Sequence, residues 1–365
     1  MKDKTLSRRQ FAATASTLIA GTVLGGGRLF GMPNIVRNLR KPNSLINGVQ
    51  IGVITYSFRS LKNQNAEATL QYVLDCGISA IELMGGPAED FAGAPKSPMD
   101  FRQLFPLYRK RRKGEELTKA ETKMLAEAEG LRKAYNETIA NWRTNVPMDK
   151  FEQMRKMYAD AGVSIYAFKP GAFGKNNTDG EIAYGMKAAK ALGASHITLE
   201  HPSDDAHTLK LGQMAEQYGV QVAYHGHTQQ TPTFWDTALE QSPANALNLD
   251  LGHYVAGGNA KPLKIIRKKH ERILSMHMKD RRTPENTQTN MPWGSGDTPL
   301  VDALRLMRKK KYTFPGTIEL EYQIPEGSDA AEAPGERDYD HGRRSGASPA
   351  SRTRQNRWRS SSLPS

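Results

Sequence analysis

Side chains that bind metals or transfer protons stand at the ends of short β-rich runs in this sequence. Several come in pairs separated by one residue, such as His225 with His227 and His277 with Lys279. Residues two apart on a strand point to the same side, so the members of a pair face the same way. Buried polar groups need partners, and histidines with carboxylates are common ligands of divalent metals. The candidates at these ends are Glu82, Lys169, Glu200, His225, His227, Asp250, His253, His277, Lys279, Glu319 and Glu321.

The elements that carry these residues follow one another as eight strand-and-helix units. Helical segments that end in glycine precede several of the strands, and glycine supplies the left-handed stop of a helix; these glycines are Gly77, Gly162, Gly193 and Gly219. Eight such units in series predict an α/β fold, a (β/α)₈ TIM barrel, whose active site lies at the carboxyl ends of the strands. The expected strands are Ile51–Thr55, Ser79–Met84, Val163–Phe168, His196–Glu200, Val220–His225, Leu247–Asp250, Ile273–Met278 and Thr317–Glu321.

One long connection, from about residue 85 to 150, interrupts the series between the second and third expected strands. Its middle is rich in Lys, Arg, Glu and Ala, which predicts a solvated helical insertion. We interpret it as a lid or as a contact between copies in a homo-oligomer. The single cysteine, Cys76, excludes an internal disulfide framework and a zinc ribbon. The formal charge of +13 is spread over the chain without a dominant cluster, so we expect no nucleic-acid partner.

The N-terminus has the layout of an export signal. Arg8 and Arg9 precede Phe11 and an uncharged stretch that runs to Gly27. This pattern predicts a twin-arginine signal over residues 1–30, with the twin-arginine export machinery as a partner. The protein is therefore expected in the periplasm or outside a bacterial cell, or anchored to the membrane by an uncleaved signal.

The rest of the chain divides into three expected parts. A linker over residues 31–46 leads into the barrel, which spans 47–330. Residues 331–365 contain no lysine and almost no aliphatic residue, which predicts a disordered tail. Our hypothesis is that the reading frame is shifted in this tail.

Short motifs at the strand ends resemble those of the xylose-isomerase-like TIM-barrel superfamily, the sugar phosphate isomerase and epimerase group. The resemblance covers roughly residues 47 to 325, and the set of motifs in this order is specific for the superfamily. It is less informative about the reaction. The motifs are Ala80–Leu83 (AIEL), Ala223–His227 (AYHGH), Leu249–His253 (LDLGH), Met276–Asp280 (MHMKD), Trp293–Asp297 (WGSGD) and Gly316–Glu321 (GTIELE).

The resemblance implies one divalent metal ion (Mn, Co, Mg or Zn) at the ends of the last four strands. On the last strand the family glutamate lies five residues after a glycine, which selects Glu321; Glu319 lies one layer deeper. This chain departs from the pattern at His225, where the epimerases have a glutamate. The expected ligands are His225, Asp250, His277 and Glu321, with Glu200 and Glu319 as second choices.

The resemblance also implies an isomerase or epimerase that removes a proton next to a carbonyl, through an enediolate. Export favours a non-phosphorylated sugar or keto-sugar as the substrate. Because His225 replaces one of the two opposed glutamates of the epimerases, β-elimination by a keto-sugar lyase stays open. The same superfamily also contains endonuclease-type phosphodiesterases, and the unusual C-terminal tail leaves a non-catalytic sugar-binding barrel as a third alternative. The candidate catalytic residues are Glu321, His253 and Lys279, and the expected substrate contacts are Glu82, His227, Lys169 and Trp293.

Overall fold

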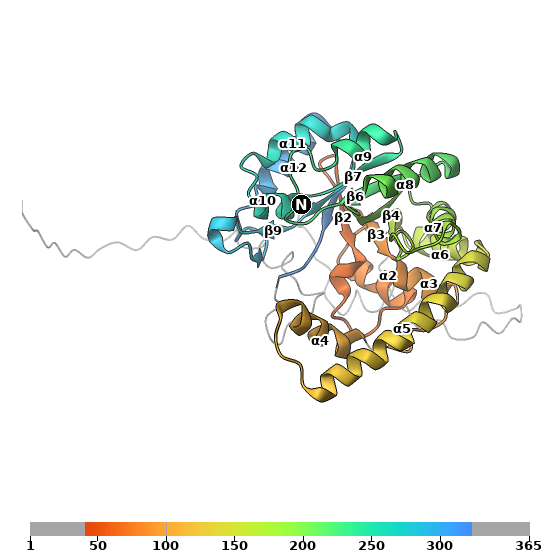
Figure 1. Ribbon diagram of the computed structural model, residues 1–365. Helices are drawn as coiled ribbons and strands as arrows, with labels where there is room; N and C mark the ends of the chain where they lie inside the picture. Colours follow the sequence, from red (N-terminus) through yellow and green to blue (C-terminus); the bar gives the residue numbers. More distant parts are fainter. Residues whose placement is uncertain (1–40, 100, 323–365) are drawn as a thin grey trace, which may run out of the picture. The chain divides into compact units, whose positions relative to one another are not determined.

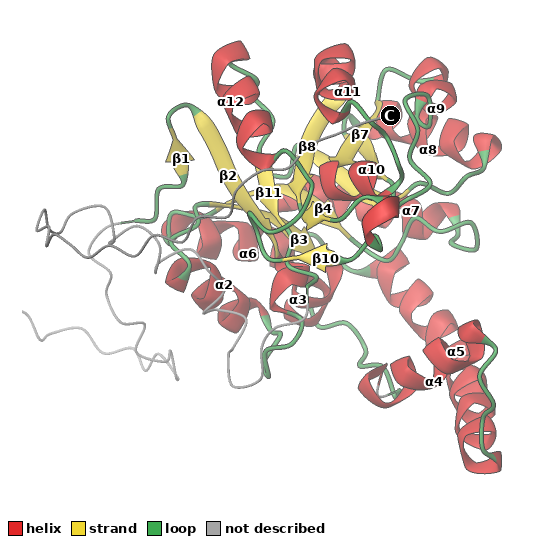
Figure 2. Cartoon of the chain, turned by 90° about the vertical axis from the view of Figure 1, so that its left-hand side faces the viewer, coloured by secondary structure: helices red, strands yellow, loops and turns green. Residues whose placement is uncertain are grey.

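A computed structural model of the chain describes residues 41–99 and 101–322 (Figures 1 and 2). The predicted export signal, most of the predicted linker and the predicted tail lie outside these residues. Within the part that is described, no helix is both long and apolar enough to cross a lipid bilayer.

Eight parallel strands form a closed barrel, which confirms the predicted (β/α)₈ fold. Each strand pairs with the next along the chain, and β2 pairs with both β3 and β11, so the sheet has no open edge between them. Helices surround the strands in Figure 1. The strands are β2 (Val49–Ile54), β3 (Ala80–Met84), β4 (Ser164–Lys169), β5 (His196–Glu200), β6 (Gln221–His225), β7 (Asn245–Asp250), β8 (Ile273–Met278) and β11 (Gly316–Ile318).

The first and last strands of the sheet differ in detail from the predicted elements. Strand β11 stops at Ile318, whereas the prediction extended it to Glu321. Beyond it, the Leu320 N–H donates to Ser57 Oγ (3.1 Å) and the Leu320 carbonyl accepts from Arg59 Nη1 (2.6 Å). These side chains take the place of the backbone hydrogen bonds that a neighbouring strand would form with Leu320. Before the first barrel strand, β1 (Leu45–Ile46) lies inside the predicted linker and pairs antiparallel with β2.

The helices that cover the barrel end as their sequences predict. All four glycines at the predicted helix ends have positive φ, and Gly193 and Gly219 are left-handed C-caps of α7 and α8. Apolar residues of these helices pack on the strands in one main core. The covering helices are α2 (Ala66–Asp75), α3 (Gly85–Phe91), α6 (Asp149–Asp160), α7 (Asp179–Leu192), α8 (Asp205–Tyr218), α9 (Asp236–Gln241), α10 (Leu251–Ala256), α11 (Pro262–Lys269) and α12 (Leu300–Lys310).

The predicted insertion is a pair of helices rather than one, α4 (Phe101–Lys113) and α5 (Lys119–Asn145). They share a small core of their own, which includes Leu104, Leu107 and Leu125. Figure 2 shows that α4 and much of α5 stand away from the barrel. At the barrel end of α5, Arg143 forms buried ion pairs with Glu89 (2.9 Å) and Glu181 (3.1 Å), which tie the helix to α3 and α7.

Candidate metal and active site at the carboxyl ends of the strands

Four buried side chains converge where the last four strands end. His225 and Asp250 are the last residues of β6 and β7, His277 is the last but one of β8, and Glu319 follows β11 directly. Parallel pairing places Asp250 opposite His277. One donor atom from each of the four residues lies within 4.8 Å of the others, so this group, called the four-ligand group below, could hold a metal ion.

Asp250 is held by the helix that it starts. Its Oδ1 accepts the His253 N–H at 2.7 Å and thereby caps α10, which accounts for the spacing of three between these residues. Gly252 lets α10 approach β8 closely, because a Cβ there would lie 2.4 Å from the Lys279 carbonyl oxygen. With Oδ1 used as a cap, the buried Asp250 Oδ2 is left to face Lys279 Nζ at 3.1 Å and both His225 Nε2 and His277 Nδ1 at 3.9 Å.

His277 lies between two carboxylates. Its Nε2 is 2.8 Å from Glu82 Oε2 and its Nδ1 is 2.8 Å from Glu319 Oε2. Burial alone would lower the pKa of His277, but the two carboxylates raise it to about 10. Burial would likewise raise the pKa of Glu82, yet His277 and Lys169 bring it down to about 2. Glu82 is therefore ionised, and His277 holds a proton while no cation replaces it.

Lys279 supplies a second buried positive charge. Its Nζ lies 3.1 Å from Asp250 Oδ2, 2.9 Å from Glu319 Oε2 and 2.8 Å from Glu321 Oε2. Burial opposes the charge, but these three carboxylates raise the pKa of Lys279 above its ordinary value. The ammonium is thus a proton donor at neutral pH, and in this arrangement it is unsuited to act as a base.

Two further histidines are neutral: His225 of the four-ligand group and His253 beside it. Burial, reinforced by Lys169, lowers the pKa of His225 to about 4. Burial also brings the pKa of His253 down to about 2, with nearby cations contributing. Asn248 Nδ2 donates to Glu82 (3.1 Å), which orients its Oδ1 toward His225 Nδ1 (2.8 Å). The ring proton of His225 therefore lies on Nδ1, and the lone pair of Nε2 faces the Asp250 side.

The four-ligand group fits a divalent cation in distance and in charge. Bonds of 2.0–2.2 Å to His nitrogen and carboxylate oxygen place neighbouring ligand atoms about 3 to 4 Å apart, and the closest pairs here lie at 2.8–3.9 Å. Three buried carboxylates (Glu82, Asp250, Glu319) face two buried cations (His277, Lys279), which leaves one net negative charge. A divalent cation that replaced the extra proton of His277 would make this set neutral.

The structure separates the two glutamates of the last strand. The Glu319 side chain is 6% exposed and belongs to the four-ligand group, whereas the Glu321 side chain is 26% exposed and contacts Lys279 at the mouth. The sequence prediction chose Glu321 as the ligand and Glu319 as the second choice. Both are on the inner side with Glu319 one layer deeper, as alternation predicts, and it is Glu319 whose side chain reaches His277.

The remaining predicted residues lie around the rim. Glu200, the other second choice, has a side chain 53% exposed and pairs with Lys169 (2.9 Å) and His227 (3.3 Å), outside the four-ligand group. His227 forms a second group of three donors with His225 and His253. It is half exposed and shares His225 with the first group, so the two groups are alternative positions for one ion.

Two residues that touch this site were not among the predicted site residues. Asn248 orients His225, and its place two residues before Asp250 is a signal in the sequence. Arg281 follows Lys279 at the same spacing of two, and its Nη1 contacts His253 Nδ1. The predicted substrate contact Trp293 is partly buried against the core, with its Nε1 buried and without a partner.

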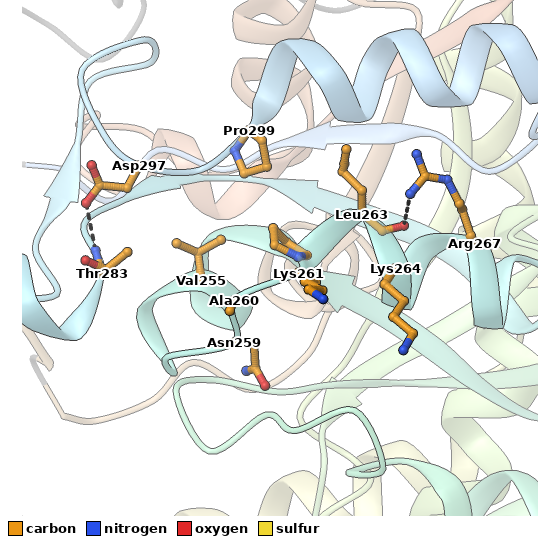
Figure 3. Close-up of a pocket in the computed structure, with 11 residues that line it drawn as sticks. Val255, Asn259, Ala260, Lys261, Leu263, Lys264, Arg267, Thr283, Asp297 and Pro299 are labelled. Carbon is orange, nitrogen blue, oxygen red and sulfur yellow. Dashed lines mark hydrogen bonds between the residues drawn. The ribbon is translucent and has the colours of Figure 1, made fainter.

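Two surface cavities lie near this end of the barrel. A cavity of about 660 Å³ separates α11 from the loop after β8 and contains none of the predicted site residues (Figure 3). Its walls include Lys261, Lys264 and Arg267, and on one side of it the Thr283 N–H donates to Asp297. A cavity of about 580 Å³ is lined by Thr55 and Met84 among others, at the carboxyl ends of β2 and β3. This second cavity opens on the same end of the barrel as the four-ligand group.

Comparisons with known proteins concern both the sequence and the fold. The model of the family described as xylose isomerase-like TIM barrel matches residues 127–345. No curated protein matches the chain. Among solved structures, the chain is similar to the probable 3-DHS dehydratase involved in petrobactin synthesis from Bacillus anthracis, with 14% identity and a TM-score of 0.50, over 78% of this chain and 95% of that one.

Two further solved structures have comparable similarity. One is 3-keto-D-glucoside 4-epimerase from E. coli, with 11% identity and a TM-score of 0.49, over 78% of this chain and 96% of that one. The other is a xylose isomerase domain protein from Planctomyces limnophilus, with 16% identity and a TM-score of 0.48, over 75% and 89% of the two chains. At these identities the likeness concerns the fold alone.

Proposed function

Because the chain belongs to the xylose isomerase-like TIM barrel family, we propose that it is a divalent-metal-dependent isomerase or epimerase of a non-phosphorylated sugar or keto-sugar. The reaction removes a proton from a carbon next to a carbonyl and returns it elsewhere through an enediolate. The observation that carries the proposal is the buried group of His225, Asp250, His277 and Glu319, one donor atom of each lying within 4.8 Å of the others.

The four-ligand group would hold the metal ion, with Mn, Co, Mg and Zn as the candidates. When bound, such an ion supplies Lewis-acid stabilisation of the negative charge that develops on the substrate oxygen. Glu82 and Asn248 would keep His277 and His225 in their orientations, since they contact the far side of each ring. Such supporting contacts fix ring orientation and tautomer.

Glu321 is the proposed proton acceptor. Among the three carboxylates that contact Lys279, it is the most exposed and the one outside the four-ligand group, so it can reach a substrate in the mouth. Lys279, kept protonated by its three carboxylates, would donate to the substrate oxygen or return a proton to carbon. His253, neutral and next to Lys279 (3.1 Å), would contact a substrate hydroxyl.

Deuterium incorporation tests this proposal. Full-length protein supplied with Mn²⁺, Co²⁺, Mg²⁺ or Zn²⁺ is incubated in D₂O with a panel of aldoses and keto-sugars, and exchange next to the carbonyl is followed by NMR. We expect exchange in the wild type, its loss in Glu321→Gln with metal retained, and no change in Glu285→Gln, an exposed glutamate in the loop after β9. Metal-loaded wild type that exchanges no proton in the panel would support a non-catalytic sugar-binding barrel instead.

A keto-sugar lyase is the second candidate, favoured by the asymmetry of the site. A carboxylate (Glu321) faces an ammonium (Lys279) at 2.8 Å, so one group can take the proton while the other protonates a departing oxygen. Two opposed carboxylates would instead suit a symmetric proton shuttle, and the neutral His225 occupies one of those positions. An unsaturated product that absorbs in the ultraviolet distinguishes elimination from isomerisation, and phosphodiesterase assays address the endonuclease-like alternative.

We also propose that the protein is exported by the twin-arginine route and acts in the periplasm. The support is the pattern of Arg8, Arg9 and Phe11 before an uncharged stretch. Replacing both arginines with lysine is expected to leave the protein in the cytoplasmic fraction. Equal periplasmic amounts of the variant and the wild type would rule out this route.

A further inference from the structure

A short hairpin lies beside the four-ligand group at the mouth of the barrel. Strand β9 (Asp280–Arg281) pairs antiparallel with β10 (Asn290–Met291), and Arg281 lies directly opposite Asn290. Arg281 reaches His253 on α10, and Asn290 Nδ2 donates to the Glu321 carbonyl (3.3 Å). The hairpin therefore contacts both sides of the mouth.

The guanidinium of Arg281 has no carboxylate within 4.0 Å in the part of the chain that the structure describes. Its Nη1 contacts His253 Nδ1, its Nη2 donates to the Gln288 carbonyl, and its Nε–H is buried without a partner. Its positive charge therefore has no ion-pair partner among the described residues. A partly buried cation with a free N–H is a group that an anion would stabilise.

Two other arginines, one buried and one partly buried, provide a comparison for Arg281. Arg143 is paired with two carboxylates. Arg272 has no carboxylate either, but its Nη2 donates to three backbone carbonyls, of Leu239, Ser242 and Asn245, so it serves to join backbone segments before β8 begins. Arg281 shares a buried Nε–H without a partner with Arg272, but it differs from both because it lies next to a candidate metal site and its guanidinium contacts a histidine there.

The loop from Asn290 to Thr298 is held in place by the carboxylate of Asp280. The Asp280 carboxylate accepts the N–H groups of Gly294 (2.9 Å), Gly296 (2.9 Å) and Thr298 (3.2 Å). Two more polar atoms in this loop, Asn290 Oδ1 and Trp293 Nε1, are buried and have no hydrogen-bond partner. One accepts and the other donates hydrogen bonds, which are the two roles that sugar hydroxyls require.

We infer that the substrate is a sugar acid whose carboxylate binds to Arg281. The inference rests on the proposed function and names its substrate class. A planar carboxylate can accept side-on from Nε–H and the second N–H of Nη2, the bidentate geometry that arginine favours. Asn290 Oδ1 and Trp293 Nε1 would bind hydroxyls of the same molecule, and its reacting carbons would lie beside the Glu321–Lys279 pair.

Paired probes that differ only in charge test the inference. Binding of D-glucuronate and D-galacturonate is compared with that of their neutral amides by calorimetry, on full-length protein loaded with Mn²⁺. We expect the wild type to bind the acids at least about tenfold more tightly, since a charge-assisted bidentate pair is stronger than hydrogen bonds between neutral groups. In Arg281→Gln the ratio should fall to about one. In Arg282→Gln, which removes the same charge from a residue paired with Asp297, the ratio should not change.

The outcomes separate the inference from the proposed function. If Arg281 only positions His253, Arg281→Gln would weaken acid and amide equally and leave the ratio intact, which overturns the inference. Three other results would overturn it as well. These are equal binding of acid and amide by the wild type, binding of neither of them, and tighter binding of D-glucose 6-phosphate than of the uronates. The metal content of the same samples decides the proposed function: protein that holds no metal contradicts that proposal, whatever the ratio.

Discussion

Replacing Glu319 with glutamine should remove the metal, whereas the same change at Glu321 should leave it bound. Glu319 Oε2 lies 2.8 Å from His277 Nδ1 on a side chain that is 6% exposed. Glu321 has a side chain 26% exposed, contacts Lys279 and is not one of the four converging donors. The two variants change the same chemical group one layer apart, so each serves as the control of the other.

The size of the difference follows from the charges. Glu319→Gln reduces the buried carboxylates from three to two while two buried cations stay, so the group no longer attracts a cation by net charge. Loss of a residue that only supports a metal ligand weakens binding by about 10- to 100-fold. Loss of a direct ligand should therefore reach at least about 100-fold, or about 2.7 kcal/mol. For Glu321→Gln we expect less than about tenfold, or about 1.4 kcal/mol.

Mn²⁺ affinity is measured by calorimetry after the metal has been removed with a chelator, and circular dichroism of the metal-free variants shows whether they fold. Deuterium exchange on the same samples should be lost in both variants, for different reasons. Retained metal in Glu319→Gln together with lost metal in Glu321→Gln would refute the depth argument. That result would favour Glu321 as the metal ligand, the residue that the spacing from Gly316 selects.

Three further predictions concern stability. Arg143→Met leaves two buried carboxylates without their cation and should cost about 3–5 kcal/mol in urea unfolding, whereas Arg111→Met, at an exposed pair, should cost less than about 1 kcal/mol. Gly296→Ala places a Cβ 2.1 Å from Asp280 Oδ1 and should destabilise its loop by about 1–3 kcal/mol, seen as faster proteolysis; Gly130→Ala, in open space on α5, should be neutral or stabilising. Burial lowers the pKa of His196 from 6.5 to about 4, so this neutral residue supports the fold above pH 6.5. About 3 kcal/mol of that support should be lost as the pH falls through 4, and His196→Gln should reduce this pH dependence.

The architecture could be predicted because the same strand-and-helix pattern is repeated along the chain. Each strand is a short β-rich run, and each of four helices ends in a glycine that the structure confirms with positive φ, such as Gly193 and Gly219. The last strand was predicted too long because Leu320 bonds to Ser57 and Arg59, which are remote in sequence. The insertion could be predicted as helical, but its division into two helices with a small core of their own depends on contacts between α4 and α5.

The site could be predicted only as far as side-chain alternation reaches. Alternation placed Glu319 and Glu321 on the inner side together, with Glu319 one layer deeper, but it does not say which of the two layers meets the ligands of the neighbouring strands. Arg281 was missed for a related reason. It continues the spacing of His277 and Lys279, but it lies on β9, beyond the end of β8, where strand parity no longer decides which way a side chain points.

The charge of the group also explains why a histidine can stand at position 225. Glu82 already contributes a carboxylate that is fully buried and ionised, with a pKa of about 2. A fourth buried carboxylate at position 225 would leave an uncompensated negative charge even with a divalent cation bound, and an unpaired buried charge is costly. His225 instead offers a lone pair without a charge, since its pKa is lowered to about 4 and Asn248 holds its proton on the far nitrogen. Glu82 on β3 and His225 on β6 thus depend on each other: the carboxylate that supports His277 supplies the negative charge that a glutamate at 225 would otherwise bring.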